Sequence, residues 1–201
     1  GYDEGGKAYH TNEMSDEEKA AMGMQDRLLL SSFSARFTRD KGPLKPQESP
    51  QEYRLGETRK SLGSLIELSE RLIAVDATLK DIIERLEPGV HQFWLINITM
   101  PKDQIYPVQY HCLVIRRFLD SFVPDKSDEG SYEYRGAGYY PSFPKKQCYN
   151  GLAISLTVIG SAHLWRENDL RSPQVLVSDD LQAEITKANL RMPKQFQLKA
   201  V

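Results

Sequence analysis

The chain has 201 residues, 40% of them hydrophobic and 27% charged, which is typical of a soluble globular protein with room for one large or two small domains. Its formal net charge of -2 gives no general attraction for nucleic acid or for an anionic membrane. No apolar run approaches the roughly 20 residues that cross a bilayer, and no signal-peptide pattern opens the chain. We therefore expect a cytoplasmic protein without nucleic-acid or membrane partners, a signal lost ahead of Gly1 being the alternative.

The two cysteines, Cys112 and Cys148, are too few for a disulfide framework. Cys112 lies within an apolar run, which predicts a buried thiol. A zinc site would have to recruit His111 and His163 to both cysteines. Because adjacent residues of a strand point to opposite faces, His111 and Cys112 cannot readily share a metal. We expect neither a metal site nor a cofactor.

The first 60 residues predict an N-terminal arm and an extended segment. Residues 1–26 are polar, and the Leu- and Phe-containing run at 27–37 fits either a strand or a buried helical turn. Three prolines between residues 43 and 50 require an extended connection. We expect residues 61–201 to form one α+β domain, which makes a compact unit with residues 27–60.

Residues 71–98 predict a strand, a helix and a second, aromatic strand. Apolar side chains recur at the three- and four-residue spacing of a helical stripe: Leu79, Ile82, Ile83 and Leu86. Asp76 precedes this stripe as a helix cap, and Pro88 with Gly89 ends it. The helix is therefore expected to pack on a sheet. Residues 93–98 and 108–118 supply two strands of that sheet, with a turn at residues 100–103 between them.

Residues 124–150 are rich in Pro, Gly and Tyr, which predicts a long loop, and its tyrosines argue against disorder. Tyr and Arg are over-represented at binding hot spots. One alternative is that the loop binds a partner, and the other is that it folds back on its own sheet. The candidate contact residues are Tyr132, Tyr134, Arg135, Tyr139 and Tyr140.

After this loop, residues 152–158 alternate between apolar and small or polar side chains, which predicts a strand with one face in the core, broken at Gly160. Residues 174–198 then repeat the pattern of residues 71–95. At a constant offset the repeat pairs Val75 with Val177, Leu79 with Leu181 and Ile83 with Ile185, and Phe93 meets Phe196 after one extra residue.

The second repeat begins its helix at Ser178, whose hydroxyl can accept from a free amide while Asp179 and Asp180 face the positive end of the helix dipole. The repeat carries no catalytic side chain in register, which points first to a binding protein. The expected fold class is α+β: a mixed, mainly antiparallel sheet with a few packed helices and two strand-helix-strand repeats.

Two other groups of side chains invite a functional interpretation. Acidic residues around the first repeat helix, including Glu84 and Glu87, either form a solvated face or mimic phosphates toward the basic groove of a nuclease. His163, with Asp169 or Asp180, could serve a small hydrolase or transferase. The alternative is that His163 caps a strand end and Arg166 pairs with a carboxylate, and no Gly-x-Ser-x-Gly elbow surrounds Ser178.

A short motif contains His163, Trp165 and Arg166, and it is followed by a polar turn, residues 175–181 and a terminal Phe196. This order of features resembles immunity-protein family eleven of bacterial polymorphic toxin systems. The resemblance covers roughly residues 65–201. Trp165 replaces the more common Phe, and residues 191–194 lack the usual Gly. What the resemblance implies is a non-enzymatic cytoplasmic antitoxin. It would bind and occlude a cognate toxin. One candidate is a nuclease that a secretion system such as type VI delivers in bacterial competition.

Overall fold

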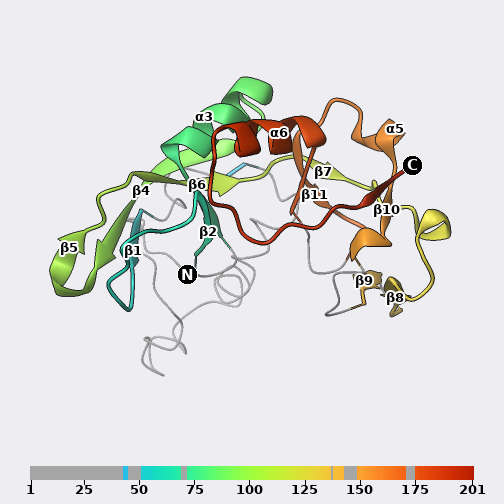
Figure 1. The fold of residues 1–201 in the computed structure, drawn as a ribbon, viewed down its shortest axis with the longest axis horizontal. Helices are drawn as coiled ribbons and strands as arrows, with labels where there is room; N and C mark the ends of the chain where they lie inside the picture. Colours follow the sequence, from blue (N-terminus) through green and yellow to red (C-terminus); the bar gives the residue numbers. More distant parts are fainter. Residues whose placement is uncertain (1–42, 45–50, 69–71, 137, 143–148, 171–174) are drawn as a thin grey trace, which may run out of the picture.

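A curved six-stranded sheet builds the half of the protein that contains the first repeat (Figure 1). The structure, a computed structural model, describes residues 43–44, 51–68, 72–136, 138–142, 149–170 and 175–201. The strand order is β1-β4-β6-β3-β2, with β5 paired to the end of β4, and β1 with β4 is the parallel pair in this sheet. The strands are β1 (Glu52–Arg54), β2 (Leu65–Glu67), β3 (Ile73–Asp76), β4 (Gln92–Met100), β5 (Gln104–Ile105) and β6 (Tyr110–Val114).

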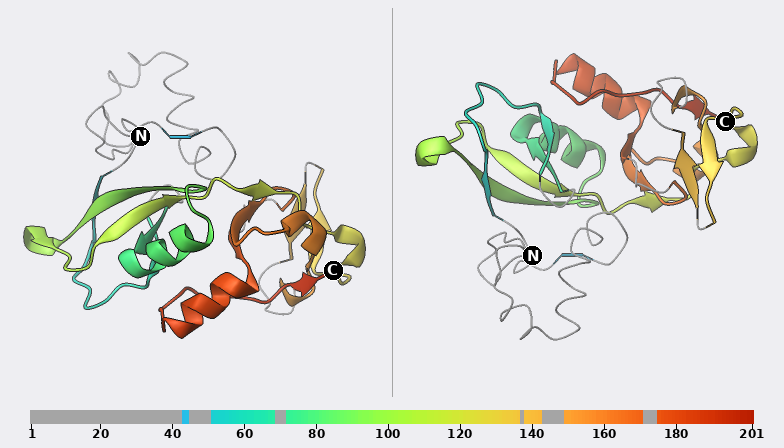
Figure 2. Two further views of the ribbon diagram at one scale, coloured as in Figure 1. Left: turned by 90° about the horizontal axis from the view of Figure 1, so that it is seen from above. Right: turned by 90° about the horizontal axis from the view of Figure 1, so that it is seen from below.

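Helix α3 (Ala77–Leu86) covers one face of this sheet (Figures 1 and 2). Asp76 caps it, because its Oδ1 accepts a hydrogen bond from the Leu79 amide at 2.9 Å. Leu79, Ile82 and Ile83 are buried, which confirms the predicted stripe. The opposite face of the sheet contains Cys112, which is fully buried as predicted, and burial raises the pKa of its thiol. The 3-10 turn η4 (Pro101–Asp103) confirms the turn expected between the strands.

The other half of the protein is built from smaller sheets. One has the order β12-β11-β7, a second pairs β10 with β13, and a third is the hairpin β8–β9. These elements are β7 (Phe118–Leu119), η5 (Pro124–Lys126), β8 (Tyr132–Tyr134), β9 (Tyr139–Pro141), β10 (Ala153–Ile154), α5 (Leu156–Ile159), β11 (Leu164–Glu167), β12 (Val175–Val177), α6 (Asp179–Lys187) and β13 (Lys199–Ala200). Most strand pairs among the described residues are antiparallel, so the α+β class with a mixed, mainly antiparallel sheet is confirmed.

The two repeats share one hydrophobic core. Val75, Leu79 and Ile83 of the first repeat are buried in the same cluster as Leu181 and Ile185 of the second. Helices α3 and α6 lie side by side in Figures 1 and 2. The repeated apolar positions are therefore the surfaces by which the two copies pack on each other.

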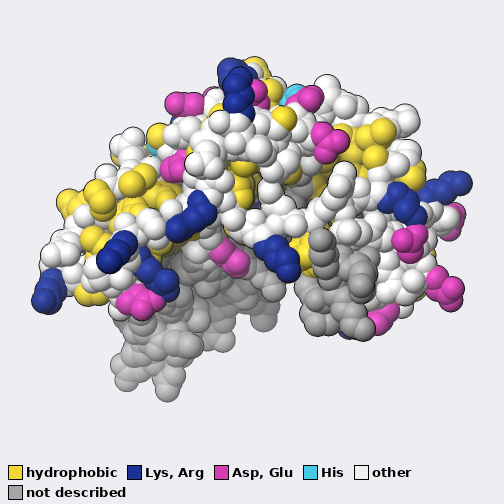
Figure 3. Space-filling view, viewed as in Figure 1, with side chains coloured by type: hydrophobic (Ala, Val, Ile, Leu, Met, Phe, Trp, Pro, Cys, Tyr) yellow, Lys and Arg dark blue, Asp and Glu magenta, His cyan; other side chains and the backbone are white. Residues whose placement is uncertain are grey.

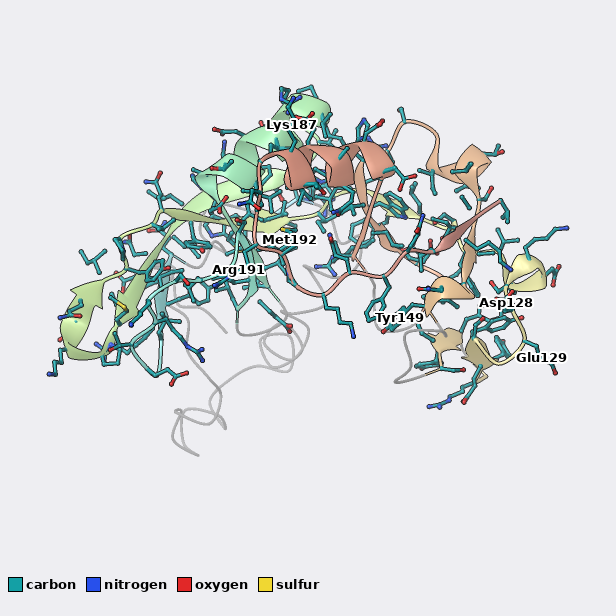
Figure 4. The ribbon with its side chains drawn as sticks, viewed as in Figure 1. Asp128, Glu129, Tyr149, Lys187, Arg191 and Met192 are labelled. Atoms are coloured by element: carbon teal, nitrogen blue, oxygen red, sulfur yellow. The ribbon has the colours of Figure 1, made fainter. Side chains whose placement is uncertain are left out.

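The third element of the second repeat differs from the prediction. The expected strand at Phe196 is wrong, because the last strand, β13, begins only at Lys199. The preceding segment follows another path: Arg191 O accepts from Ser64 N beside β2, and Phe196 stacks on Tyr149 with 4.6 Å between ring centroids. Figure 4 labels Arg191, Met192 and Tyr149 along this route.

Two predicted strands are shorter in the structure. Only Ala153 and Ile154 of residues 152–158 form a strand, because the chain turns at Leu156 into the single helical turn α5. The side chains of Leu156 and Val158 are consequently 58% and 45% exposed. The strand expected at residues 108–118 is split, because β6 belongs to the large sheet and β7 to the three-stranded one.

Several expectations concern regions outside the described residues. The run at 27–37, the polar arm and Cys148 all lie there. Among the helices of the described ranges, none has both the length and the apolar character that a membrane span requires.

Candidate partner-binding site

The tyrosine-rich segment folds into the β8–β9 hairpin, at one end of the protein in Figure 1. Its register places Tyr134 opposite Tyr139 and Glu133 opposite Tyr140. Since side chains alternate across a strand, the first pair lies on one face of the hairpin and the second pair on the other. The predicted contact residues are therefore divided between two faces with different surroundings.

The inner face of the hairpin packs against the protein. The rings of Tyr132 and Tyr139 each lie edge-on to buried Phe122, with 5.3 Å between centroids in both pairs. The Tyr132 hydroxyl donates to Pro124 O at 3.3 Å. Tyr134 shares this face but extends past the core and is 62% exposed. Tyr132 and Tyr139 therefore support the hairpin, as the fold-back alternative predicted. The exposed Tyr134 ring lies beside Tyr139, and its hydroxyl donates to Gly136 O at 2.8 Å.

The outer face of the hairpin carries a fixed arginine. Arg135 donates through Nε and Nη2 to Glu133 Oε2 at 2.9 and 2.7 Å, and its Cζ lies 5.3 Å from the centroid of the Tyr140 ring. The guanidinium is thus held between a carboxylate and an aromatic face while remaining exposed. Glu133 is not among the residues predicted from the sequence, although its position two residues before Arg135 is the signal of such a pair.

The segment that leads into the hairpin and forms its first strand is acidic. Between residues 120 and 135 five acidic and two basic side chains give a formal charge of -3. Figure 3 shows acidic side chains at the end of the protein that carries the hairpin, together with some basic ones, and Figure 4 labels Asp128 and Glu129 there. Asp128 is paired with Lys199.

The prediction that Glu87 belongs to an exposed acidic edge is wrong. Its side chain is only 2% exposed. The carboxylate lies at the end of α3 and accepts four hydrogen bonds. Oε1 accepts from Arg117 Nε at 2.9 Å and His163 N at 3.1 Å, and Oε2 accepts from His91 Nε2 at 2.7 Å and Leu164 N at 3.0 Å. Burial alone would raise the pKa of Glu87, but these hydrogen bonds and the Arg117 charge lower it overall.

Glu84 lies on α3 and is half-buried. Figures 1 and 2 place this helix away from the β8–β9 hairpin. The structure therefore does not bring Glu84 or Glu87 together with the five hairpin residues, and a single surface containing all seven predicted positions is absent from the described part of the chain.

His163 contacts a helix cap. Its Nδ1 lies 2.9 Å from Ser178 Oγ, and the same hydroxyl accepts from Leu181 N at 3.1 Å, which confirms Ser178 as the cap of α6. Asp180 lies in the first turn of that helix, and the backbone oxygen of Asp169 accepts from Tyr139 N. The His163 ring and the Ser178 hydroxyl thus both take part in the cap of α6. Arg166 is buried in β11, and burial lowers the pKa of its guanidinium to about 10.

A second buried carboxylate, Glu167, was missed by the sequence analysis. It is 1% exposed, and its Oε2 accepts from both the amide and the hydroxyl of Ser121, while Oε1 accepts from Asp169 N at 3.1 Å. Trp165 Nε1 donates to the same hydroxyl at 3.3 Å. Burial raises the pKa of Glu167, although these hydrogen bonds oppose the rise. The available signal was an acid at the end of a strand that begins with the apolar residues Leu164 and Trp165.

Within the described ranges, no group of three or more His, Cys, Asp or Glu side chains is arranged to hold a metal ion. Comparison with curated proteins finds no match. A family model described as "Immunity protein family (Imm11)" matches residues 8–197, nearly the whole chain. That match implies an immunity function and a toxin as partner in general terms. The chain belongs to the Imm11 immunity protein family.

Proposed function

We propose that this protein neutralises a cognate toxin without catalysis, by binding it through the β8–β9 hairpin and covering its functional surface. The observation that carries the proposal is the fixed position of Arg135 between Glu133 and Tyr140, next to exposed Tyr134. Arg and Tyr dominate binding hot spots, and a side chain that is already held in place loses less conformational entropy on binding.

The acidic segment that leads into the hairpin supports a partner with a basic surface. The formal charge of -3 over residues 120–135 attracts such a surface and accelerates its association. A nuclease delivered into the cytoplasm by a secretion system, type VI among them, has a groove of the required sign. The protein would then act in the cytoplasm during competition between bacteria, and its association rate would fall steeply with added salt.

The first experiment is co-expression with the toxin encoded beside this gene, followed by co-purification and a growth assay for relief of toxicity. We expect a stable complex and restored growth. If neither is obtained, the proposed toxin-binding function is wrong for that partner and the hairpin loses its assigned role.

The second experiment locates the interface with single substitutions. Tyr140→Ala removes the ring beneath Arg135, and we expect the affinity to fall by about 2 kcal/mol or more. Ile105→Ser is the matched control, because Ile105 is 76% exposed on β5 at the opposite end of the protein in Figure 1. If Ile105→Ser weakens the complex and Tyr140→Ala does not, the interface lies at the β4–β5 end instead.

A further inference from the structure

Glu167 is 1% exposed, so a partner cannot contact its side chain directly. Its carboxylate joins two chain segments, one containing Ser121 and Phe122 and the other containing Asp169. Both segments continue to the β8–β9 hairpin, along different routes. The carboxylate of Glu167 is therefore linked to the hairpin by two separate routes.

The first route runs through Phe122. Ser121 is fully buried, donates twice to Glu167, and its carbonyl oxygen accepts from Ser155 N at 2.8 Å. These bonds fix the backbone of the next residue, Phe122, which lies edge-on to the rings of Tyr132 and Tyr139. A shift of Ser121 would therefore displace the surface on which the inner face of the hairpin rests.

The second route runs through the backbone of β9. Asp169 N donates to Glu167 Oε1, and Asp169 O accepts from Tyr139 N at 3.3 Å, beside the bridge between Tyr139 and Leu170. The first residue of β9 is thereby attached to the end of β11. Tyr140, the proposed contact beneath Arg135, is the next residue along that strand.

We propose that Glu167 is a positioning residue for toxin binding: it sets the hairpin in its binding orientation by holding Ser121 and Asp169 at once. This inference rests on the proposed function, because it concerns the same interface. Glutamine has an NH2 group in place of one carboxylate oxygen. That group would face an N–H that now donates to Glu167, so the hydrogen bond to one of the two segments would be lost.

Glu87 provides a matched control for this test. Glu87 is also a buried carboxylate, and it accepts four hydrogen bonds. One of its donors is Leu164 N, at the first residue of β11, whereas Glu167 is the last residue of that strand. Glu87→Gln should destabilise the fold in a similar way, but none of its four donors is Ser121, Phe122 or Asp169, the residues through which Glu167 reaches the hairpin. General destabilisation and loss of positioning are thereby separated.

The experiment measures the dissociation constant for the neighbouring toxin, inactivated by substitution, under conditions where each variant is folded. We expect Glu167→Gln to weaken binding about tenfold and Glu87→Gln by less than about twofold. Hydrogen exchange at the Tyr139 amide should accelerate in Glu167→Gln alone. Equal affinities for the two variants would overturn the positioning role.

Two further variants complete the test. If Glu167→Gln does not fold, Ser121→Ala removes only the hydroxyl, and we expect about threefold weaker binding with faster exchange at Tyr139. Unchanged affinity in that variant would also overturn the role. Tyr140→Ala is measured in parallel. If it weakens binding while Glu167→Gln and Glu87→Gln bind the toxin with equal affinity, the hairpin interface is supported and the positioning role of Glu167 is wrong. If Tyr140→Ala has no effect, both proposals are wrong.

Discussion

Tyr139 lies edge-on to Phe122 with 5.3 Å between ring centroids, whereas the next residue, Tyr140, lies beneath Arg135 on the other face of the hairpin. Of these two adjacent tyrosines, Tyr139 supports the hairpin and Tyr140 is the proposed contact with the toxin. A double substitution would mix these effects, so single substitutions are required.

We expect Tyr139→Ala to lower the free energy of unfolding by about 2 to 4 kcal/mol, because it removes a ring that packs on Phe122, Tyr132 and Tyr134. Tyr140→Ala should cost less than about 1 kcal/mol of stability while reducing toxin affinity. Urea unfolding and binding measurements on both variants check this. The reverse pattern, with Tyr140→Ala unfolding the protein, would contradict the assignment of the two faces.

Glu87→Gln should lower the free energy of unfolding by about 3 kcal/mol, because the neutral amide cannot accept all four donors and leaves a buried N–H facing another donor. Chemical denaturation at neutral pH measures the change. The control is Glu57→Gln, since Glu57 is an exposed acid paired with Arg59 and should lose almost nothing.

The stability contributed by Glu87 should also depend on pH. Its folded-state pKa is lowered, so the contribution is present above the unfolded pKa and is lost as pH falls through the folded value. Glu167 has the opposite sign: its raised pKa means that the folded state gains stability as pH falls through that raised value. We expect the native protein to lose stability between neutral and strongly acidic pH, and Glu87→Gln not to show this loss. Denaturation midpoints over that pH range measure the difference. An identical acid profile in Glu87→Gln would assign that loss to other carboxylates.

Ser178→Ala should lower the free energy of unfolding by about 1 kcal/mol without loss of toxin neutralisation, because its hydroxyl caps α6. Asp76→Ala, which removes the equivalent cap of α3, is the matched control. Thermal melting and the growth assay measure the two effects. If folded Ser178→Ala no longer neutralises the toxin while Asp76→Ala still does, a catalytic role for Ser178 and His163 would be supported.

Gly63→Ala should destabilise the fold by about 1 to 3 kcal/mol. A Cβ at this position would lie 2.9 Å from Arg191 O, on the segment whose carbonyl accepts from Ser64 N. Gly56→Ala is the control, because a Cβ there would meet nothing within 4 Å. Thermal melting of the two variants is the measurement, and equal melting temperatures would show that the contact with Arg191 relaxes without cost.

The sequence by itself determined the helices of the two repeats and drew attention to the tyrosine-rich segment, which it predicted as a loop and not as a hairpin. The caps at Asp76 and Ser178 and the stripe at Leu79, Ile82 and Ile83 follow from bonds and contacts between near neighbours in the chain. The tyrosines were identified by composition, but composition does not assign them to faces, so support and contact could not be separated.

Only the tertiary structure decided the environment of the buried acids and the ends of the strands. Glu87 was expected at the surface because it follows an amphipathic helix, yet its donors at Arg117 and His163 are 30 and 76 residues away. The strand at Ile154 ends where its partner β13 ends, and Glu167 is held by Ser121, 46 residues earlier. Hydrogen bonds and pairing between distant segments fix these features, and no local pattern encodes which distant segments will meet.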